Sequence, residues 1–135
     1  MSRIAVFDTS IFIDQLRTGR HTARINSFIG LIRTSSVVLS ELWRGTRSTA
    51  DREFLRKLSR NHPVLSPTEK NWIESGQILA RMAEDHGFTS GKLRDLHFDA
   101  LIALTARSIG ARLITTNRAD FELIKRYRAF DLEIW

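Results

Sequence analysis

The sequence predicts a single α/β domain in which a mostly parallel central sheet is flanked by helices. Short apolar runs, typical of buried strands, alternate along the chain with longer segments whose apolar residues recur at helical spacing. The chain has 135 residues, of which 42% are hydrophobic and 27% are charged. That is enough for one packed core. No repeat or linker divides the chain, so we expect one domain over residues 1–135.

The predicted strands are short and follow the apolar runs. We expect them at Ile4–Phe7, Ser36–Leu39, Val64–Leu65, Arg112–Thr116 and Leu132–Trp135. The second strand is predicted from the consecutive residues Val37, Val38 and Leu39, and the last one would close an edge of the sheet.

Helices are expected between these strands, where a capping residue precedes an amphipathic segment. They are predicted at Ile11–Arg17, His21–Arg33, from Ser40 onward, Thr49–Arg60, Thr68–His86, Asp95–Ile109 and Asp120–Tyr127. Ser40 and Thr68 are the expected caps of two of them, and Gly87 ends the helix that Thr68 begins. Residues 88–92 contain Gly91 and are expected to form a flexible loop.

Composition excludes several classes of function. The chain has no cysteine, which rules out disulfides, thiolate zinc sites and cysteine nucleophiles. Its net charge is +6, and 17 of its 21 basic residues are arginine, which favours nucleic acid over membrane as a polyanionic partner. No apolar run approaches the ~20 residues of a membrane span. Asp8 and Asp14 exclude a signal peptide, so we expect a cytoplasmic protein.

Four acidic residues fall where a parallel α/β sheet binds ligands, outside the carboxyl ends of its strands. Asp8 directly follows the first predicted strand, Glu41 lies two residues after the second, and Asp120 lies four residues after Thr116, where another predicted strand ends. Asp99 lies within the apolar segment 98–106, where a lone ionised carboxylate would cost several kcal/mol unless it is paired or binds a cation. Asp95 lies one helical turn earlier on the same face.

Oxygen ligands without cysteine, together with four scattered histidines, favour Mg²⁺ or Mn²⁺ over zinc at such a site. Structural explanations exist for three of the acids taken singly. Asp8 and Asp120 suit helix caps, and Glu41 suits a first-turn charge. Asp99 has no such explanation, because caps do not lie in helix interiors.

Four segments resemble, in order, the motifs of PIN-domain nucleases, and more narrowly those of VapC-type toxins of toxin–antitoxin pairs. They are Val6–Asp14, Ser40–Gly45, Phe98–Ala103 and Ile114–Phe121. The resemblance implies an acidic metal pocket formed by Asp8, Glu41, Asp99 and Asp120, with Thr9 or Ser10 holding Asp8. It leaves open whether Asp120 or Asn117 faces the metal.

The resemblance further implies a homodimer that cleaves RNA with Mg²⁺ or Mn²⁺, leaves 5′-phosphate and 3′-hydroxyl ends, and is silenced by a VapB-type antitoxin. Arg44 and Arg47, with the arginines at 52, 56 and 60, are expected to guide the phosphate backbone. A solvated helix face explains the same arginines equally well.

Other classes with acids after a first strand fit less well. A receiver domain requires an acidic residue ending its central strand and a late Lys-Pro pair, and both are missing here. A haloacid-dehalogenase-type phosphatase requires a second acid where this chain has Ser10. Two alternatives stay open: a non-catalytic module on the same fold that binds RNA or a partner protein, and, within the nucleases, a processing or repair enzyme.

Overall fold

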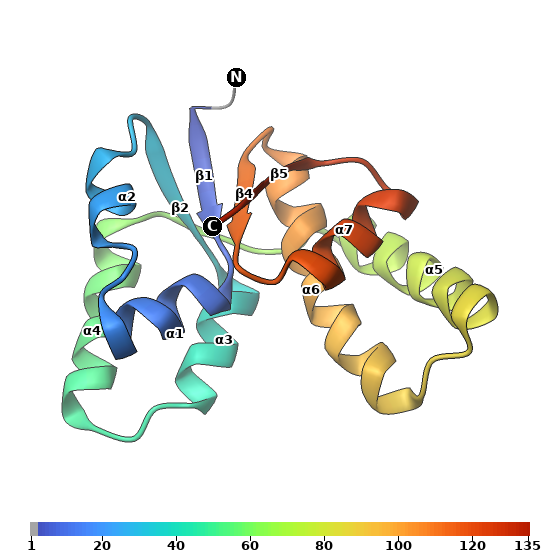
Figure 1. The fold of residues 1–135 in the computed structure, drawn as a ribbon, viewed down its shortest axis with the longest axis horizontal. Helices are drawn as coiled ribbons and strands as arrows, with labels where there is room; N and C mark the ends of the chain where they lie inside the picture. The colour runs from blue at the N-terminus through green and yellow to red at the C-terminus, as the bar shows by residue number, and fades with distance from the viewer. Residues whose placement is uncertain (1–2) are drawn as a thin grey trace.

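Residues 3–135 are described by a computed structural model, in which five parallel strands form one sheet (Figure 1). The strands are β1 (Ile4–Phe7), β2 (Leu31–Ser35), β3 (Val64–Leu65), β4 (Arg112–Thr115) and β5 (Asp131–Ile134). Their order in the sheet is β3-β2-β1-β4-β5, and every neighbouring pair is parallel. The carboxyl ends of all five strands therefore meet at one edge, as the sequence predicts.

Seven helices connect the strands within residues 3–135. They are α1 (Thr9–Thr18), α2 (Thr22–Ser27), α3 (Ser36–Arg44), α4 (Thr49–Asn61), α5 (Glu69–His86), α6 (Ser90–Ser108) and α7 (Arg118–Tyr127). Figure 1 shows α1 to α4 on one side of the strands and α5 to α7 on the other. None of these helices is long and apolar enough to cross a membrane.

The predicted α/β class is confirmed, and helix α5 illustrates why. Thr68 accepts a hydrogen bond from the backbone N–H of Asn71, whose side chain accepts one in return from the N–H of Thr68. This capping box satisfies backbone donors that the first turn leaves free. The helix ends where Gly87 adopts a left-handed conformation with φ of 63°.

Within residues 21–44, the predicted helices are confirmed at residues 22–27 and 41–44, but the prediction between them is wrong. The expected helix ends early, at Ser27, and Leu31–Ser35 forms strand β2. Gly30 makes this possible, because a Cβ there would lie 2.2 Å from the carbonyl oxygen of Arg3, the residue directly before strand β1. Polar Arg33 and Thr34 interrupt the apolar pattern of β2, which conceals the strand in the sequence.

The expected strand at Ser36–Leu39 is instead the first half of helix α3. Its cap is Ser35 and not Ser40, because the Ser35 hydroxyl accepts hydrogen bonds from the N–H groups of Val37 and Val38. A short apolar run does not by itself distinguish a buried strand from a buried helix. Glu41 therefore lies on the second turn of a helix and not just past a strand.

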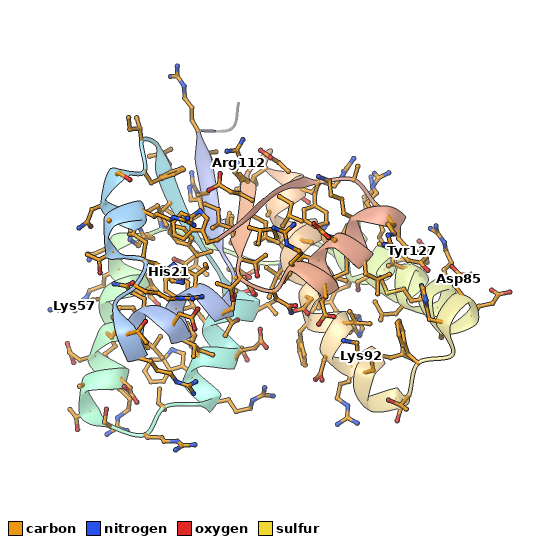
Figure 2. The ribbon with its side chains drawn as sticks, in the orientation of Figure 1. His21, Lys57, Asp85, Lys92, Arg112 and Tyr127 are labelled. Carbon is orange, nitrogen blue, oxygen red and sulfur yellow. The ribbon has the colours of Figure 1, made fainter. Side chains whose placement is uncertain are left out.

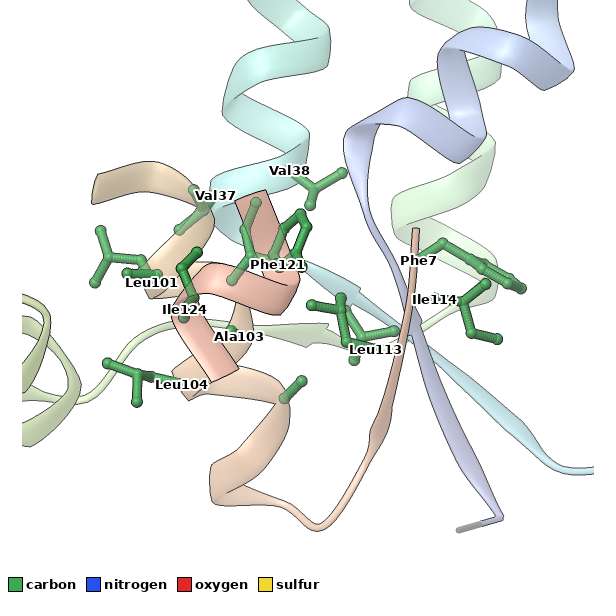
Figure 3. Close-up of a cluster of buried hydrophobic side chains, with 14 of the residues drawn as sticks. Phe7, Val37, Val38, Leu101, Ala103, Leu104, Leu113, Ile114, Phe121 and Ile124 are labelled. Carbon is green, nitrogen blue, oxygen red and sulfur yellow. The ribbon is translucent and has the colours of Figure 1, made fainter. Parts of the chain in front are cut away.

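One part of the core lies between the sheet and the most apolar helix, α6, and α1, α3 and α4 also contribute to the core, through residues such as Ile11, Val38 and Leu55. All residues from Ala100 to Ala106 are buried, which explains why this helix shows no polar face there. Figure 3 shows Phe121 and Ile124 of α7 in the same cluster as Leu113 of strand β4. Helix α6 also starts earlier than predicted. Thr89 caps it through the N–H of Lys92, so the expected loop over 88–92 is mostly helix.

Candidate active site

Asp8 is the most buried of the four candidate acids, at 4% exposed. Its backbone N–H donates to the carbonyl of Ile114 at 2.9 Å, which prolongs the pairing of β1 with β4 and fixes the residue at the sheet edge. Its Oδ2 accepts hydrogen bonds from the hydroxyls of Ser10 at 2.9 Å and Thr115 at 2.8 Å. Burial raises the pKa of Asp8, and the two hydroxyls partly oppose that effect.

Thr115 is a residue that the sequence analysis missed. It is fully buried at the carboxyl end of β4, and its hydroxyl oxygen also accepts the N–H of Asn117 at 3.0 Å. Ser10 accepts the N–H of Thr116 at 3.1 Å. The two hydroxyls thus tie the first segment of the site to the turn after β4. The sequence did contain one signal that could have pointed to Thr115: it is a threonine at the end of a predicted strand, within the segment that precedes Asp120.

Glu41 is presented by α3, which starts directly after β2. Its Oε1 accepts a hydrogen bond from the Thr9 hydroxyl at 2.9 Å. Partial burial raises the pKa of Glu41, and the negative charges of Asp8 and Asp95 raise it further. The Thr9 hydrogen bond and the charge of Arg44 act in the opposite direction. Thr9 therefore holds Glu41 and Ser10 holds Asp8, so both hydroxyls contact the site.

Asp99 lies on α6, just before the buried run that starts at Ala100. Burial, followed by the charges of Asp8, Asp120 and Glu41, raises its pKa to about 8. Without a bound cation, the Asp99 carboxyl is therefore mainly protonated at neutral pH. The same couplings indicate that acids from four separate segments lie within electrostatic reach of one point.

Asp120 lies on the first turn of α7, behind its cap Asn117. The Asn117 side chain accepts the N–H of Asp120 at 3.4 Å and donates to Asp120 Oδ2 at 3.2 Å. Asn117 is thus the cap of this helix, and Asp120 is not. The other carboxylate oxygen of Asp120, Oδ1, pairs with the ammonium of Lys92 at 2.8 Å. Lys92 is the second residue that sequence reasoning missed, because it falls in the segment predicted as a loop.

The donor set suits a hard divalent cation. The candidate ligands are all carboxylates, they repel one another, and Mg²⁺ and Mn²⁺ prefer such oxygens. In the described chain, however, no three acidic or histidine side chains come close enough together to hold one ion.

The remaining predicted residues surround this site. Asp95 is exposed, one turn before Asp99 on α6, and its charge reaches Glu41. Arg44 is also exposed and acts on Glu41 from the same helix. Arg47 lines a groove of about 410 Å³ between α1, α3 and α4, together with Arg17 and with Glu41 itself. This groove therefore places two arginines, together with the acidic Asp51, beside one acid of the site.

The arginines farther along α4 are engaged differently. Glu53 pairs with Arg56 at 3.3 Å and with Arg60 at 3.8 Å, and all three side chains are more than half exposed. These contacts match the solvated helix face that the sequence analysis kept as an alternative.

The chain belongs to the PIN domain family, whose model matches residues 5–127. Solved structures with the same fold include VapBC-1 from nontypeable Haemophilus influenzae, with 23% identity, 98% of each chain covered and a TM-score of 0.71. DNA-bound VapBC from Salmonella typhimurium has 24% identity, covers 100% of this chain and 99% of its own, and has a TM-score of 0.70.

A third similar structure is VapBC-5 from Mycobacterium tuberculosis, described as a member of the VapBC family of toxin–antitoxin systems. It has 23% identity, covers 98% of this chain and 97% of its own, and has a TM-score of 0.63. No curated protein sequence matches the chain. The match to the PIN domain model and the shared fold of these structures confirm the predicted PIN fold.

Proposed function

We propose that this protein is a metal-dependent endoribonuclease and the toxin of a toxin–antitoxin pair. The observation that carries the proposal is the electrostatic coupling of Asp8, Glu41 and Asp120 to Asp99. Acids that repel one another this strongly favour a cation in their midst. Membership of the PIN domain family supports nuclease chemistry.

Asp8, Glu41, Asp99 and Asp120 would hold Mg²⁺ or Mn²⁺, which when bound polarises a phosphodiester and lowers the pKa of water. The side chains of the protein position these carboxylates and accept the proton. Thr9, Ser10 and Thr115 fix the carboxylates by hydrogen bonds, which reduces the reorganisation needed during reaction. A carboxylate not fully engaged as a ligand would accept the proton of the attacking water.

RNA is the substrate we propose, and the net charge of +6 supports a polyanion. Arg47 and Arg17 in the groove beside Glu41 would contact the phosphate backbone, with Arg44 near its rim. A VapB-type antitoxin is the proposed partner, supported by the fold shared with VapBC complexes. We further propose a homodimer in the cytoplasm.

A non-catalytic RNA- or partner-binding module is the second candidate. The observation that favours it is the Lys92–Asp120 ion pair, which engages one of the four acids with a side chain of the same protein. Such a module would bind its partner without a metal, whereas the nuclease requires one.

The discriminating experiment incubates a labelled single-stranded RNA and a tRNA pool with purified protein in Mg²⁺, Mn²⁺ or EDTA. Asp8→Asn serves as the matched variant, because it keeps the shape of the side chain and removes the charge. Cleavage that needs the metal and is lost in the variant would support the nuclease. RNA binding that persists in EDTA, with no metal binding and no cleavage, would support the module.

A further inference from the structure

The net positive charge of the chain lies entirely in its N-terminal part. Residues 1–62 contain eleven basic and five acidic residues, whereas residues 63–135 contain ten of each, so the first part carries the whole net charge of +6. The first part includes helices α1 to α4, which Figure 1 shows together on one side of the strands. A polyanion is therefore attracted to this side of the molecule.

Helix α4 carries a row of arginines on this side. Arg52, Arg56 and Arg60 follow one another at intervals of four residues, which places them on one face of the helix, about 6 Å apart along its axis. Arg56 and Arg60 share a single acidic partner, Glu53, and all three of these side chains are more than half exposed. Exposed ion pairs are weak, so phosphate groups can take the place of Glu53.

An exposed tryptophan lies beside this row. Trp43 on α3 is 37% exposed, and the guanidinium carbon of Arg56 lies 5.9 Å from the centre of its ring. Trp43 comes two residues after Glu41, and this spacing places the two side chains on opposite sides of α3. Trp43 therefore belongs to the surface that α3 shares with α4 and not to the acidic site.

The charge around Trp43 distinguishes it from another exposed tryptophan, Trp72 on α5, which is 51% exposed. The ring of Trp72 contacts His97 edge-on, and within residues 3–135 no arginine or lysine lies over it. Helix α5 has four acidic and two basic residues apart from its histidine, whereas α4 has two acidic and four basic residues. Only the Trp43 surface thus combines an aromatic ring with an excess of positive charge.

We infer that Trp43 and the arginine row of α4 form a binding surface for single-stranded RNA, in which an unpaired base stacks on the Trp43–Arg56 pair and phosphates lie along the row. Stacking on an aromatic ring beside a positively charged track is how proteins bind single strands without reading their sequence. The bases of a duplex are already stacked and paired, so they are not available to Trp43. This inference rests on the RNA substrate of the proposed function and adds a contact on the far side of α3 from Glu41.

The test is the binding of a labelled oligouridine strand to the full chain, measured by fluorescence anisotropy in EDTA so that neither cleavage nor metal binding contributes. The wild type is compared with Trp43→Leu, which keeps an apolar side chain without a ring, and with Trp43→Phe, which keeps a ring. Trp72→Leu is the matched control. An RNA duplex is titrated in parallel, and circular dichroism verifies that each variant is folded.

The arginine row is tested separately. Arg56→Gln is compared with Arg81→Gln on α5, because the guanidinium carbon of Arg81 also lies over an aromatic ring, 5.0 Å from the centre of Tyr127. Figure 2 shows Tyr127 on the opposite side of the molecule from Lys57 of α4. The control therefore removes the same charge from the same kind of contact, far from the row.

We expect Trp43→Leu to bind oligouridine at least about fivefold more weakly than the wild type, as for the loss of one stacked base. Trp43→Phe should lose less, and Trp72→Leu should lose nothing. Binding of the duplex should be the same in Trp43→Leu as in the wild type. Arg56→Gln should weaken binding of the strand and reduce its salt dependence by about 0.7, and Arg81→Gln should change neither.

Wild-type affinity for oligouridine in folded Trp43→Leu, or an equal loss for strand and duplex, would overturn the inference. Either result would leave the proposed nuclease standing, because metal-dependent cleavage and its loss in Asp8→Asn are measured separately. A wild type that binds no RNA strand would overturn the proposed RNA substrate as well.

Discussion

The hydroxyl of Thr115 donates a hydrogen bond to the Asp8 carboxylate over 2.8 Å, although the two residues are 107 positions apart in the chain. Parallel pairing of β1 with β4 makes this contact possible, because it aligns Phe7 with Ile114 and brings the ends of both strands together. The buried Asp8 carboxylate is thereby held by a neighbouring strand as well as by its own turn.

Removing the Thr115 hydroxyl should therefore loosen the site. In Thr115→Val the shape is kept, but Asp8 and the N–H of Asn117 each lose a partner. We expect a loss of about 1–3 kcal/mol in the free energy of unfolding and weaker Mn²⁺ binding. Chemical denaturation and metal titration measure the two effects.

Thr105→Val is the matched control for this variant. Thr105 is also buried, but its hydroxyl donates only to the carbonyl of Leu101 within α6. It should leave Mn²⁺ affinity unchanged. Equal metal affinity in Thr115→Val and Thr105→Val would show that the Thr115 hydroxyl does not position Asp8.

Neutralising Asp99 should raise the stability of the metal-free protein and abolish its activity. Asp99→Asn removes a charge that burial and three neighbouring acids oppose. In EDTA at pH 8 we expect the variant to be more stable than the wild type by about 1–3 kcal/mol, and inactive toward RNA when metal is added. Thermal denaturation and a cleavage assay test this, and a variant that is less stable in EDTA would contradict it.

The metal-free wild type should lose stability as the pH rises. The pKa of Asp99 is about 8 in the folded protein and near 3.9 in an unfolded chain, so the folded state binds the extra proton between these values. The stabilisation of the folded state by this proton is fully present below the pKa of Asp99 in the unfolded chain. It is lost as the pH rises through about 8, the pKa of Asp99 in the folded protein. Asp8 and Glu41, whose pKa values are also raised, act in the same direction.

Urea denaturation in EDTA at pH 5, 6, 7 and 8 measures this dependence. The free energy of unfolding should fall across the series in the wild type and fall less in Asp99→Asn. Identical slopes for the two proteins would contradict the raised pKa of Asp99.

Arg47 in the groove beside Glu41 provides a test of the RNA path. Arg47→Gln should weaken the binding of single-stranded RNA in EDTA and reduce the salt dependence of the binding constant by about 0.7, the value for one lost phosphate contact. Fluorescence anisotropy at several salt concentrations measures both. Arg81→Gln on α5, where the guanidinium lies over Tyr127, is the control and should change neither. An equal effect of both variants would indicate that RNA binding depends on the net charge of the protein and not on Arg47 in the groove.

Much of the fold could be predicted from the sequence where local signals agree with tertiary packing. Helix α5 has a capping box at Thr68 and a left-handed glycine at its end, and both are visible in the sequence. Asp99 could be singled out because a carboxylate amid apolar residues needs a compensating partner. Between Gly30 and Glu41 the local signals mislead, because β2 carries polar residues and α3 carries the apolar run.

The contacts that organise the site were harder to predict. Lys92 faces Asp120 because α6 begins at Ser90, a boundary that the glycine at position 91 concealed. Thr115 reaches Asp8 through strand pairing that no local pattern reveals. Long-range contacts of this kind depend on which strands pair and in what register, and no local pattern in this sequence reveals either.

The chemistry of the cut ends tests the central claim most directly. A single-stranded RNA is incubated with Mn²⁺ and either wild-type protein or Asp8→Asn, and the ends of the products are identified by mass spectrometry. Attack by activated water predicts 5′-phosphate and 3′-hydroxyl ends with the wild type and intact RNA with the variant. Ends carrying 2′,3′-cyclic phosphate, or equal cleavage by both proteins, would contradict a metal-dependent nuclease built on these four acids.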